Sequence, residues 1–388
     1  MSESAIGERS TVALVRCDTY DAQDVRDAVG RGLDLLGGAA RFVSPGETLL
    51  LKPNFLVASV PEAAVTTHPA VFDAVARHLQ AAGATLTYGD SPGFGSSRGA
   101  ARRGGLEPIA QELEIAPADF SQGSKVSFTE GSLIKQFTIA QGVLDADGIV
   151  SLPKLKTHGL TRMTGAIKNQ FGCIPGVLKG EFHAKVPSAE RFSRMLVDLN
   201  GALKPRLFVM DGIVGMEGNG PRGGTPRPMR CLILSDDPVA VDATVCRLIG
   251  LDPELVDCIT IGEAEGLGRY RDVQVVGDAI EALAQPDFDV NRRPGSTTGG
   301  DGGGAFARLF KTLVVPRPVV IPENCTKCGT CVQVCPVTPK AIDWPNGDRQ
   351  TPPTHRYDDC IRCYCCQELC PHEAITTQTP LLGRLVRR

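Results

Sequence analysis

The sequence predicts an α/β protein with a mainly parallel sheet flanked by helices, followed by a small C-terminal α+β domain rich in cysteine. Over roughly the first 285 residues, apolar segments typical of strands alternate with segments of helical periodicity. Several of these apolar segments are continuous rather than alternating, as expected for strands that helices cover on both faces. Nine of the 14 cysteines fall between Cys325 and Cys370, which sets the end of the chain apart.

The expected helices of the first domain have recognisable ends. Pro69 begins one helix and Gly83 ends it. Asp237 is the expected N-cap of another helix, with Pro238 in its first turn and Gly250 at its end. Because strands and helices alternate, a parallel sheet is predicted. The expected strands are Thr11–Cys17, Thr48–Pro53, Thr85–Asp90, Asp147–Leu152, Leu207–Asp211, Cys231–Asp236 and Val273–Val276.

Composition divides the chain into four segments. Residues 1–285 form the predicted α/β domain, which would bind substrate, and 286–318 form a glycine-rich linker. Residues 319–378 form the cysteine-rich domain, and 379–388 are a basic tail. Within the linker, residues 292–304 are rich in Gly, Ser and Thr, which is typical of a flexible connection. Ala305–Val315 predicts a short amphipathic helix packed on the body.

Charge and hydropathy exclude several classes of protein. The 41 Lys and Arg residues against 44 Asp and Glu give a net charge of −3, which argues against a general nucleic-acid binder. The chain contains no apolar run long enough to span a membrane. Its first residues lack the basic and then apolar pattern of a signal peptide. We therefore expect a cytoplasmic protein that binds neither nucleic acid nor membrane, and a homodimer is compatible with the sequence.

The cysteine-rich domain contains one motif twice. In this motif, three cysteines spaced two residues apart wrap one iron–sulfur cubane, and a fourth cysteine before proline reaches the other cubane. Zinc sites are instead built from isolated CxxC pairs, and clustered thiols in a chain without a leader argue against disulfides. Cys365 is an additional thiol, expected to be a packing residue. We predict two [4Fe–4S] clusters, the first held by Cys325, Cys328, Cys331 and Cys370 and the second by Cys335, Cys360, Cys363 and Cys366.

In the first domain, polar side chains lie at or directly after predicted strands. Ligands of open parallel α/β sheets bind at the carboxyl ends of the strands, so these side chains are expected to share one site. Segment 151–185 is especially basic, with six Lys and Arg, two His and the single acid Glu181. Such a patch suits a carboxylate or phosphate, although a solvated basic surface would have the same composition. We predict catalytic roles for Lys156, His158, Lys168 and Asp211, and substrate binding by Lys52, Asn54, Asp90, Lys154, Asn169 and His183.

One glycine pattern is discounted. Gly218-x-Gly220-x-x-Gly223 matches the pattern of dinucleotide sites, but Pro221 and Pro226 follow and no helix is expected to begin there. No flavin or NAD motif is therefore assigned. Cys173 lies beside the basic segment and is expected to be a buried thiol.

Seven segments of the body together resemble the family described as domain of unknown function 362. The resemblance covers about residues 10–280 and implies an iron–sulfur protein that often carries a ferredoxin-type domain, without a defined substrate. The C-terminal segment similarly resembles the ferredoxins with two [4Fe–4S] clusters. A fainter similarity, confined to the THP segment and its helix, is to nickel-dependent lactate racemases. The seven segments are KPN (52–54), THP (67–69), GDSPG (89–93), LPKLKTH (152–158), TGAIKNQFG (164–172), DGIVGMEGNGP (211–221) and DPVAVDA (237–243).

Together these features favour an iron–sulfur reductase. An external electron donor (a ferredoxin, a flavodoxin or a reductase) would supply single electrons, which suits a stepwise reduction of an anionic small molecule. Two alternatives stay open: an electron-transfer or adaptor protein that serves a partner enzyme, and a non-redox α/β enzyme whose clusters are structural.

Overall fold

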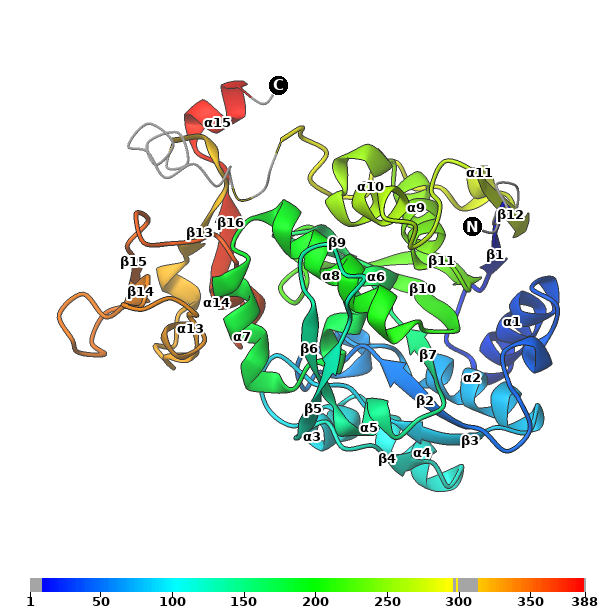
Figure 1. Ribbon diagram of the computed structural model, residues 1–388. Coiled ribbons are helices and arrows are strands. Elements are labelled where there is room, and N and C mark those ends of the chain that lie inside the picture. The colour runs from blue at the N-terminus through cyan, green and yellow to red at the C-terminus, as the bar shows by residue number, and fades with distance from the viewer. Residues whose placement is uncertain (1–8, 296–297, 299–312, 387–388) are drawn as a thin grey trace.

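A ten-stranded sheet forms the centre of the body (Figure 1). The computed structural model describes residues 9–295, 298 and 313–386. Eight strands follow each other in the order β12-β1-β11-β10-β7-β2-β3-β4, while β8 pairs with β10 and β9. The strands are β1 (Ser10–Arg16), β2 (Thr48–Pro53), β3 (Thr85–Tyr88), β4 (Ala116–Pro117), β7 (Gly148–Leu152), β8 (Lys154–His158), β9 (Arg162–Thr164), β10 (Leu207–Glu217), β11 (Thr225–Ser235) and β12 (Val273–Gly277).

Most strand pairs of this sheet are parallel, so the predicted fold class is confirmed. Six of its nine pairs are parallel, and the antiparallel ones are β1 with β11, β10 with β11, and β8 with β9. Strands β10 and β11 are longer than expected and form a hairpin. The glycine pattern at 218–223 lies in the connection of this hairpin, where no helix begins. A separate hairpin consists of β5 (Gly123–Ser127) and β6 (Gln136–Ala140).

Helices cover both faces of the sheet (Figure 1). Alternate residues of a strand point to opposite faces, and accordingly Leu50 packs in one hydrophobic core while Leu49 and Leu51 pack in the other. The body helices are α1 (Ala22–Leu35), α2 (Pro69–Ala81), α3 (Ser97–Arg103), α4 (Leu106–Glu112), α5 (Gln141–Leu144), α6 (Ala166–Asn169), α7 (Gly176–Lys185), α8 (Ala189–Leu203), α9 (Pro238–Leu248), α10 (Asp257–Ala264) and α11 (Ile280–Leu283).

The expected starts of two helices are confirmed. Helix α2 begins at Pro69, and its N-cap His68 accepts a hydrogen bond from the Ala70 backbone N–H. Helix α9 begins at Pro238, and the Asp237 carboxylate accepts from two backbone N–H groups of the first turn. These caps satisfy N–H groups that have no partner inside the helix.

Segment 154–158 differs from its prediction. It was expected as a polar segment after a strand, but it forms strand β8, which pairs with β10 and β9. All five of its residues are buried. Because strand residues alternate in direction, Lys154, Lys156 and His158 project from the same face of β8. Their direction therefore follows from the strand and not from a loop.

The cysteine-rich domain lies beside α7 at one end of the body (Figure 1). Its strand β13 pairs with β16, and β14 pairs with β15. Before this domain, Phe288 belongs to the body core, so body packing continues past residue 285. Residues 305–312 of the expected linker helix lie outside the described residues. The elements are β13 (Arg317–Val320), α13 (Thr330–Gln333), β14 (Ile342–Asp343), β15 (Thr354–His355), α14 (Cys365–Glu368), β16 (Ile375–Gln378) and α15 (Leu381–Val386).

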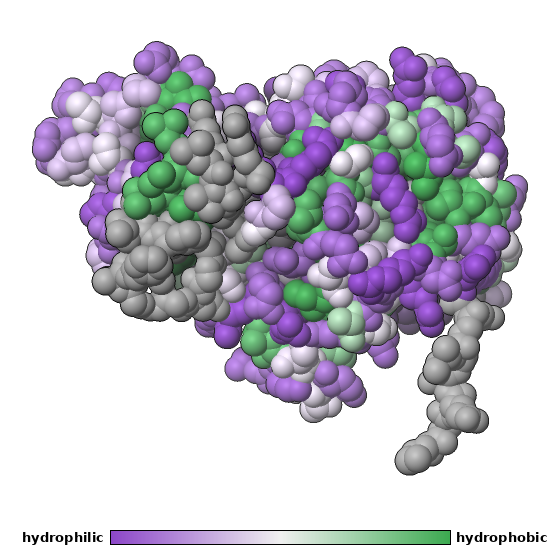
Figure 2. Space-filling model, turned by 90° about the horizontal axis from the view of Figure 1, so that it is seen from above, coloured by the Kyte–Doolittle hydropathy of each residue, from purple (hydrophilic) through white to green (hydrophobic). Residues whose placement is uncertain are grey.

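The described surface mixes polar and apolar residues. On the face shown in Figure 2, hydrophobic patches are separated by hydrophilic residues. Among the helices described, none combines the length and the apolar character that a membrane span requires.

Candidate functional site

The eight motif cysteines form two groups, each around its own small cavity. The outer quartet consists of Cys325, Cys328, Cys331 and Cys370, and the inner quartet of Cys335, Cys360, Cys363 and Cys366. All of these thiols are free. The grouping follows the crossed pattern expected from the sequence, with the fourth cysteine of each motif beside the three of the other.

The donor geometry fits iron–sulfur clusters better than zinc. A structural zinc ion holds four ligands about 2.0–2.3 Å from one point. Among the residues that the structure describes, no three His, Cys, Asp or Glu side chains converge to hold a single metal ion. Four thiols around a cavity instead match a cubane, whose irons are separate ligation points. The two quartets also differ in exposure, since Cys328 is exposed whereas every inner cysteine is buried.

A cavity of about 580 Å³ lies between the body and the cluster domain. We call it the interdomain cavity. Five residues predicted for the substrate site line its body side, namely Asn54, Asp90, Lys168, Asn169 and His183. Its other side comes from the cluster domain and includes Val334, Cys335, Lys340, Cys365, Glu368 and Leu369. A predicted cluster ligand, Cys335, is thus in the wall of the same cavity as the predicted substrate-binding residues.

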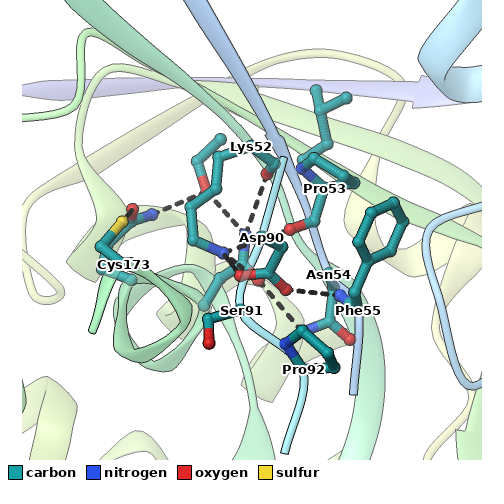
Figure 3. Close-up of polar contacts among 12 residues, drawn as sticks. Lys52, Pro53, Asn54, Phe55, Asp90, Ser91, Pro92 and Cys173 are labelled. Carbon is teal, nitrogen blue, oxygen red and sulfur yellow. Dashed lines mark hydrogen bonds and ion pairs between the residues drawn. The ribbon is translucent and has the colours of Figure 1, made fainter. Parts of the chain in front are cut away.

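A buried network at the end of β2 supports the body side of the cavity (Figure 3). The Lys52 ammonium pairs with the Asp90 carboxylate at 2.8 Å and contacts the Asn169 side-chain oxygen at 3.3 Å. The Asn54 amide donates to the same Asn169 oxygen at 3.0 Å. The other Asp90 oxygen accepts from the Phe55 backbone N–H at 2.6 Å. Lys52 itself does not line the cavity, so it positions the lining residues Asn54, Asp90 and Asn169.

Gly172 leaves room for this network. A Cβ atom at this position would overlap the Asp90 carboxylate and lie 2.9 Å from the Lys52 Nζ. We expect Gly172→Ala to lower the free energy of unfolding by about 1–3 kcal/mol, as measured by urea denaturation. Gly180→Ala in α7 is the matched control, because its Cβ would meet no described atom within 4 Å and alanine favours helix. Equal stability of both variants would contradict the tight packing at Gly172.

Lys156 lies behind the network and outside the cavity lining. Its Nζ donates to the Asn54 side-chain oxygen at 2.6 Å and to the Val65 carbonyl oxygen at 2.5 Å. Burial, and then the charge of Lys168, lower the pKa of Lys156 to about 7. Its contacts make it a positioning residue for Asn54, and the catalytic role expected from the sequence stays a prediction.

Lys154 and Asp211 form a second buried cluster, away from the cavity lining. The Lys154 ammonium pairs with one Asp211 oxygen at 2.8 Å and donates to the Tyr20 hydroxyl oxygen, also at 2.8 Å. The Tyr20 hydroxyl donates to the other Asp211 oxygen at 2.8 Å. The Tyr20 ring stacks on the His68 ring with centres 3.6 Å apart. This pair joins β8 to β10 inside the body and does not line the interdomain cavity, and the roles expected for Asp211 as acid and Lys154 as ligand stay predictions.

His158 and Lys168 contact the cluster domain through Glu368. The His158 Nε2 lies 3.5 Å, and the Lys168 Nζ 4.0 Å, from the Glu368 carboxylate. The His158 Nδ1 accepts from the Leu160 backbone N–H at 3.0 Å, so in the neutral ring the proton is on Nε2. Burial lowers the pKa of His158 to about 4, so the ring is neutral at pH 7. His158 borders another hollow and does not line the interdomain cavity, and its expected catalytic role stays a prediction.

Three further features of the cavity wall concern proton and ligand contacts. His183 stacks on Phe192 at 4.6 Å, and burial lowers the pKa of His183 to about 4. Lys179 donates to the Ser91 and Pro92 carbonyl oxygens, and burial lowers the pKa of Lys179 to about 8. The Thr164 hydroxyl is buried and has no hydrogen-bond partner among the described residues. Sequence reasoning did not select Lys179 or Thr164, although both lie in the basic segment that it singled out.

The family described as domain of unknown function 362 matches residues 49–247. The chain belongs to this family. A 4Fe-4S dicluster domain matches residues 317–371, which covers both quartets. In this member of the domain of unknown function 362 family, the KPN, GDSPG and TGAIKNQFG segments converge on the interdomain cavity, through residues such as Asn54, Asp90 and Asn169.

Individual relatives were also found. A thylakoid-associated protein of Synechocystis sp. is 38% identical over 258 residues, which are 66% of this chain and 80% of that protein. Lactate racemase apoprotein from Thermoanaerobacterium thermosaccharolyticum has a TM-score of 0.40 at 12% identity, covering 62% of this chain and 57% of that one. A protein from Thermotoga maritima has a TM-score of 0.35 at 12% identity, covering 64% and 60%. The chain thus spans less than two thirds of either solved structure.

Proposed function

We propose that this protein is an iron–sulfur reductase that delivers electrons to an anionic small molecule in the interdomain cavity. The observation that carries the proposal is the composition of the cavity wall. Basic and amide side chains of the body face it from one side, and Cys335 of the inner quartet faces it from the other. An electron-transfer domain and a ligand cavity in direct contact favour a reductase over a separate carrier.

The two quartets are the proposed ligands of two [4Fe–4S] clusters. When bound, such clusters would supply single electrons, taken from an external donor of the ferredoxin, flavodoxin or reductase type. The external donor and the cytoplasmic location expected from the sequence stay predictions.

The cavity wall suggests the chemical class of the substrate. Lys168 and Lys179 provide two cations, and the Thr164 hydroxyl is a free donor within the described part of the wall. The acids of the wall already have cationic neighbours: Asp90 pairs with Lys52 and Glu181 with Lys185, while Glu368 lies 4.0 Å from Lys168. Phe94 and Phe171 add apolar surface to the same wall. We therefore propose a substrate with one anionic group and an apolar, reducible body.

Protons must accompany a two-electron reduction, and Lys179 is suited to provide one. The balanced change is substrate plus two electrons plus two protons, giving the dihydro product. A lysine with a pKa of about 8 is largely protonated at pH 7 and still able to transfer its proton. His183 is neutral at this pH because its pKa is about 4, so it acts in orientation and packing. The second proton comes from solvent.

We expect Lys168→Ala to slow oxidation of the reduced protein by small anions at least about tenfold, because one charge-assisted contact is lost. The protein is reduced with dithionite, separated from it, and mixed anaerobically with aryl and enoyl carboxylates while cluster absorbance is followed. Lys125→Ala is the control, since Lys125 is exposed on β5 and does not line the interdomain cavity.

Two results would overturn the proposal. One is equal oxidation rates for Lys168→Ala and the unmodified protein. The other is oxidation by redox proteins but by none of the small anions, which would favour the adaptor alternative.

A further inference from the structure

The two halves of the cluster domain differ at one position of their shared motif. Lys327 and Arg362 lie between the first and second cysteines of their motifs, and their φ angles of 59° and 63° are both positive. Lys327 is exposed, and its Nζ donates to the Gln350 carbonyl oxygen at 2.8 Å. Arg362 is buried, with 0% of its surface exposed. The repeat therefore places a solvated cation beside the outer quartet and a buried cation beside the inner quartet.

The Arg362 guanidinium has few partners among the described residues. Its Nη1 donates to the Tyr357 carbonyl oxygen at 3.5 Å, and its central carbon lies 5.0 Å from the centre of the Tyr357 ring. Its Nε and Nη2 are buried without a hydrogen-bond partner in the described part of the chain. Arg362 lies two residues after Cys360 and directly before Cys363, so its buried side chain starts within the loop that carries the inner quartet. A buried charge needs compensation, and the thiolates of the inner quartet can provide it.

Hydrogen bonds from the backbone do not distinguish the quartets. The Ala341 N–H donates to the Cys335 sulfur at 3.3 Å, and the Ala374 N–H donates to the Cys370 sulfur at 3.3 Å. These contacts are equivalent in the two motifs. Side-chain contacts do differ, since the His355 Nε2 lies 3.5 Å from the Cys366 sulfur and the Thr330 hydroxyl lies 3.4 Å from the Cys328 sulfur. Besides these contacts, the quartets differ in the exposure of their cysteines and in the burial of Arg362.

The burial of the inner cysteines and the burial of Arg362 shift the reduction potential of the inner cluster in opposite directions. Reduction adds negative charge to a thiolate-bound cluster, and burial disfavours added charge. A buried guanidinium opposes that effect through protein of low dielectric constant, whereas an exposed ammonium is screened by water and salt. Without Arg362, the inner cluster would therefore have a lower reduction potential than the outer cluster.

We propose that Arg362 is the counter-charge of the inner cluster and holds its reduction potential above that of the outer cluster. With clusters bound, an electron entering beside the exposed Cys328 would pass inward to the quartet that includes Cys335 and borders the interdomain cavity. The outer cluster would lose the one electron that the inner cluster gains, and no bond would form or break. The inference rests on the two clusters of the proposed function.

The test is an electron paramagnetic resonance titration of the full chain, reconstituted anaerobically. We expect Arg362→Gln to lower one of two potentials by about 59 mV or more, which is a tenfold change in a one-electron equilibrium. Lys327→Gln is the matched control at the equivalent position and should move neither potential. Arg362→Lys keeps the positive charge, so its potentials should lie close to those of the unmodified protein. Equal potentials in all variants, or a shift of the same size in Lys327→Gln, would overturn the inference.

A measurement on the unmodified protein does not depend on the variants folding. A soluble paramagnetic dysprosium complex relaxes exposed clusters more strongly than buried ones. The cluster that is reduced first should be the less sensitive to this complex, because it is the inner one. If the more sensitive cluster is reduced first, the proposed order is wrong. An iron content well below about eight per chain would instead contradict the two clusters of the proposed function.

Discussion

Lys154→Met should lower the free energy of unfolding of the body by about 3–5 kcal/mol, because it leaves the Asp211 carboxylate buried without its counter-ion. Both side chains are almost fully buried, with 1% and 0% of their surfaces exposed. The Tyr20 hydroxyl and the His68 backbone N–H still donate to Asp211, but neither carries a charge that offsets the carboxylate. Urea denaturation followed by circular dichroism measures the change.

A double variant separates the ion pair from the packing around it. In Lys154→Met with Asp211→Leu no charge is left buried, so about 2 kcal/mol or more of the loss should be recovered. Lys185→Met is the matched control, since its side chain is 66% exposed and its pair with Glu181 lies at the surface, so its loss should hardly change stability. A stable but inactive Lys154→Met variant would contradict the structural role and favour the site predicted from the sequence.

The sheet could be predicted because strand and helix signals are local. The apolar runs of β2 and β7, and the caps at Asp237 and Pro238, are readable without tertiary information. Strand β8 could not be recognised in the same way. Its sequence KLKTH alternates charged and apolar residues, which indicates one solvated face. In the structure both faces are buried, because Asp211 and Asn54 provide buried partners for its lysines.

The candidate site was only partly predictable for a related reason. The ends of β2 and β3 place Asn54 and Asp90 together at the carboxyl edge of the sheet, as the rule for parallel sheets implies. Asn169 joins them from the end of helix α6. The same rule does not tell whether a side chain faces a cavity or the interior, and Lys154 and Asp211 face the interior. The wall opposite, including Glu368, comes from another domain, whose position depends on packing that the sequence pattern does not contain.

The spacing of the cysteines predicted both quartets. A substitution in the inner quartet is therefore expected to have the largest effect on cofactor content. Cys335 belongs by sequence to the first motif, yet it lies with Cys360, Cys363 and Cys366. We therefore expect Cys335→Ser to reduce iron from about eight to about four atoms per chain, by loss of the inner cluster. Iron and sulfide analysis of the anaerobically reconstituted protein measures this.

Cys365→Ser provides the control. Cys365 directly precedes the inner cysteine Cys366, but it lines the interdomain cavity and belongs to neither quartet, so its loss should leave about eight irons. In Cys335→Ser, the remaining paramagnetic signal should be the one that is sensitive to the soluble dysprosium complex, because the outer quartet keeps the exposed Cys328. If the sensitive signal disappears instead, Cys335 binds with its own motif, and the crossed arrangement is wrong. In that case Cys335 would not connect the inner cluster to the interdomain cavity, and electrons would have to reach the substrate past other residues of the cavity wall.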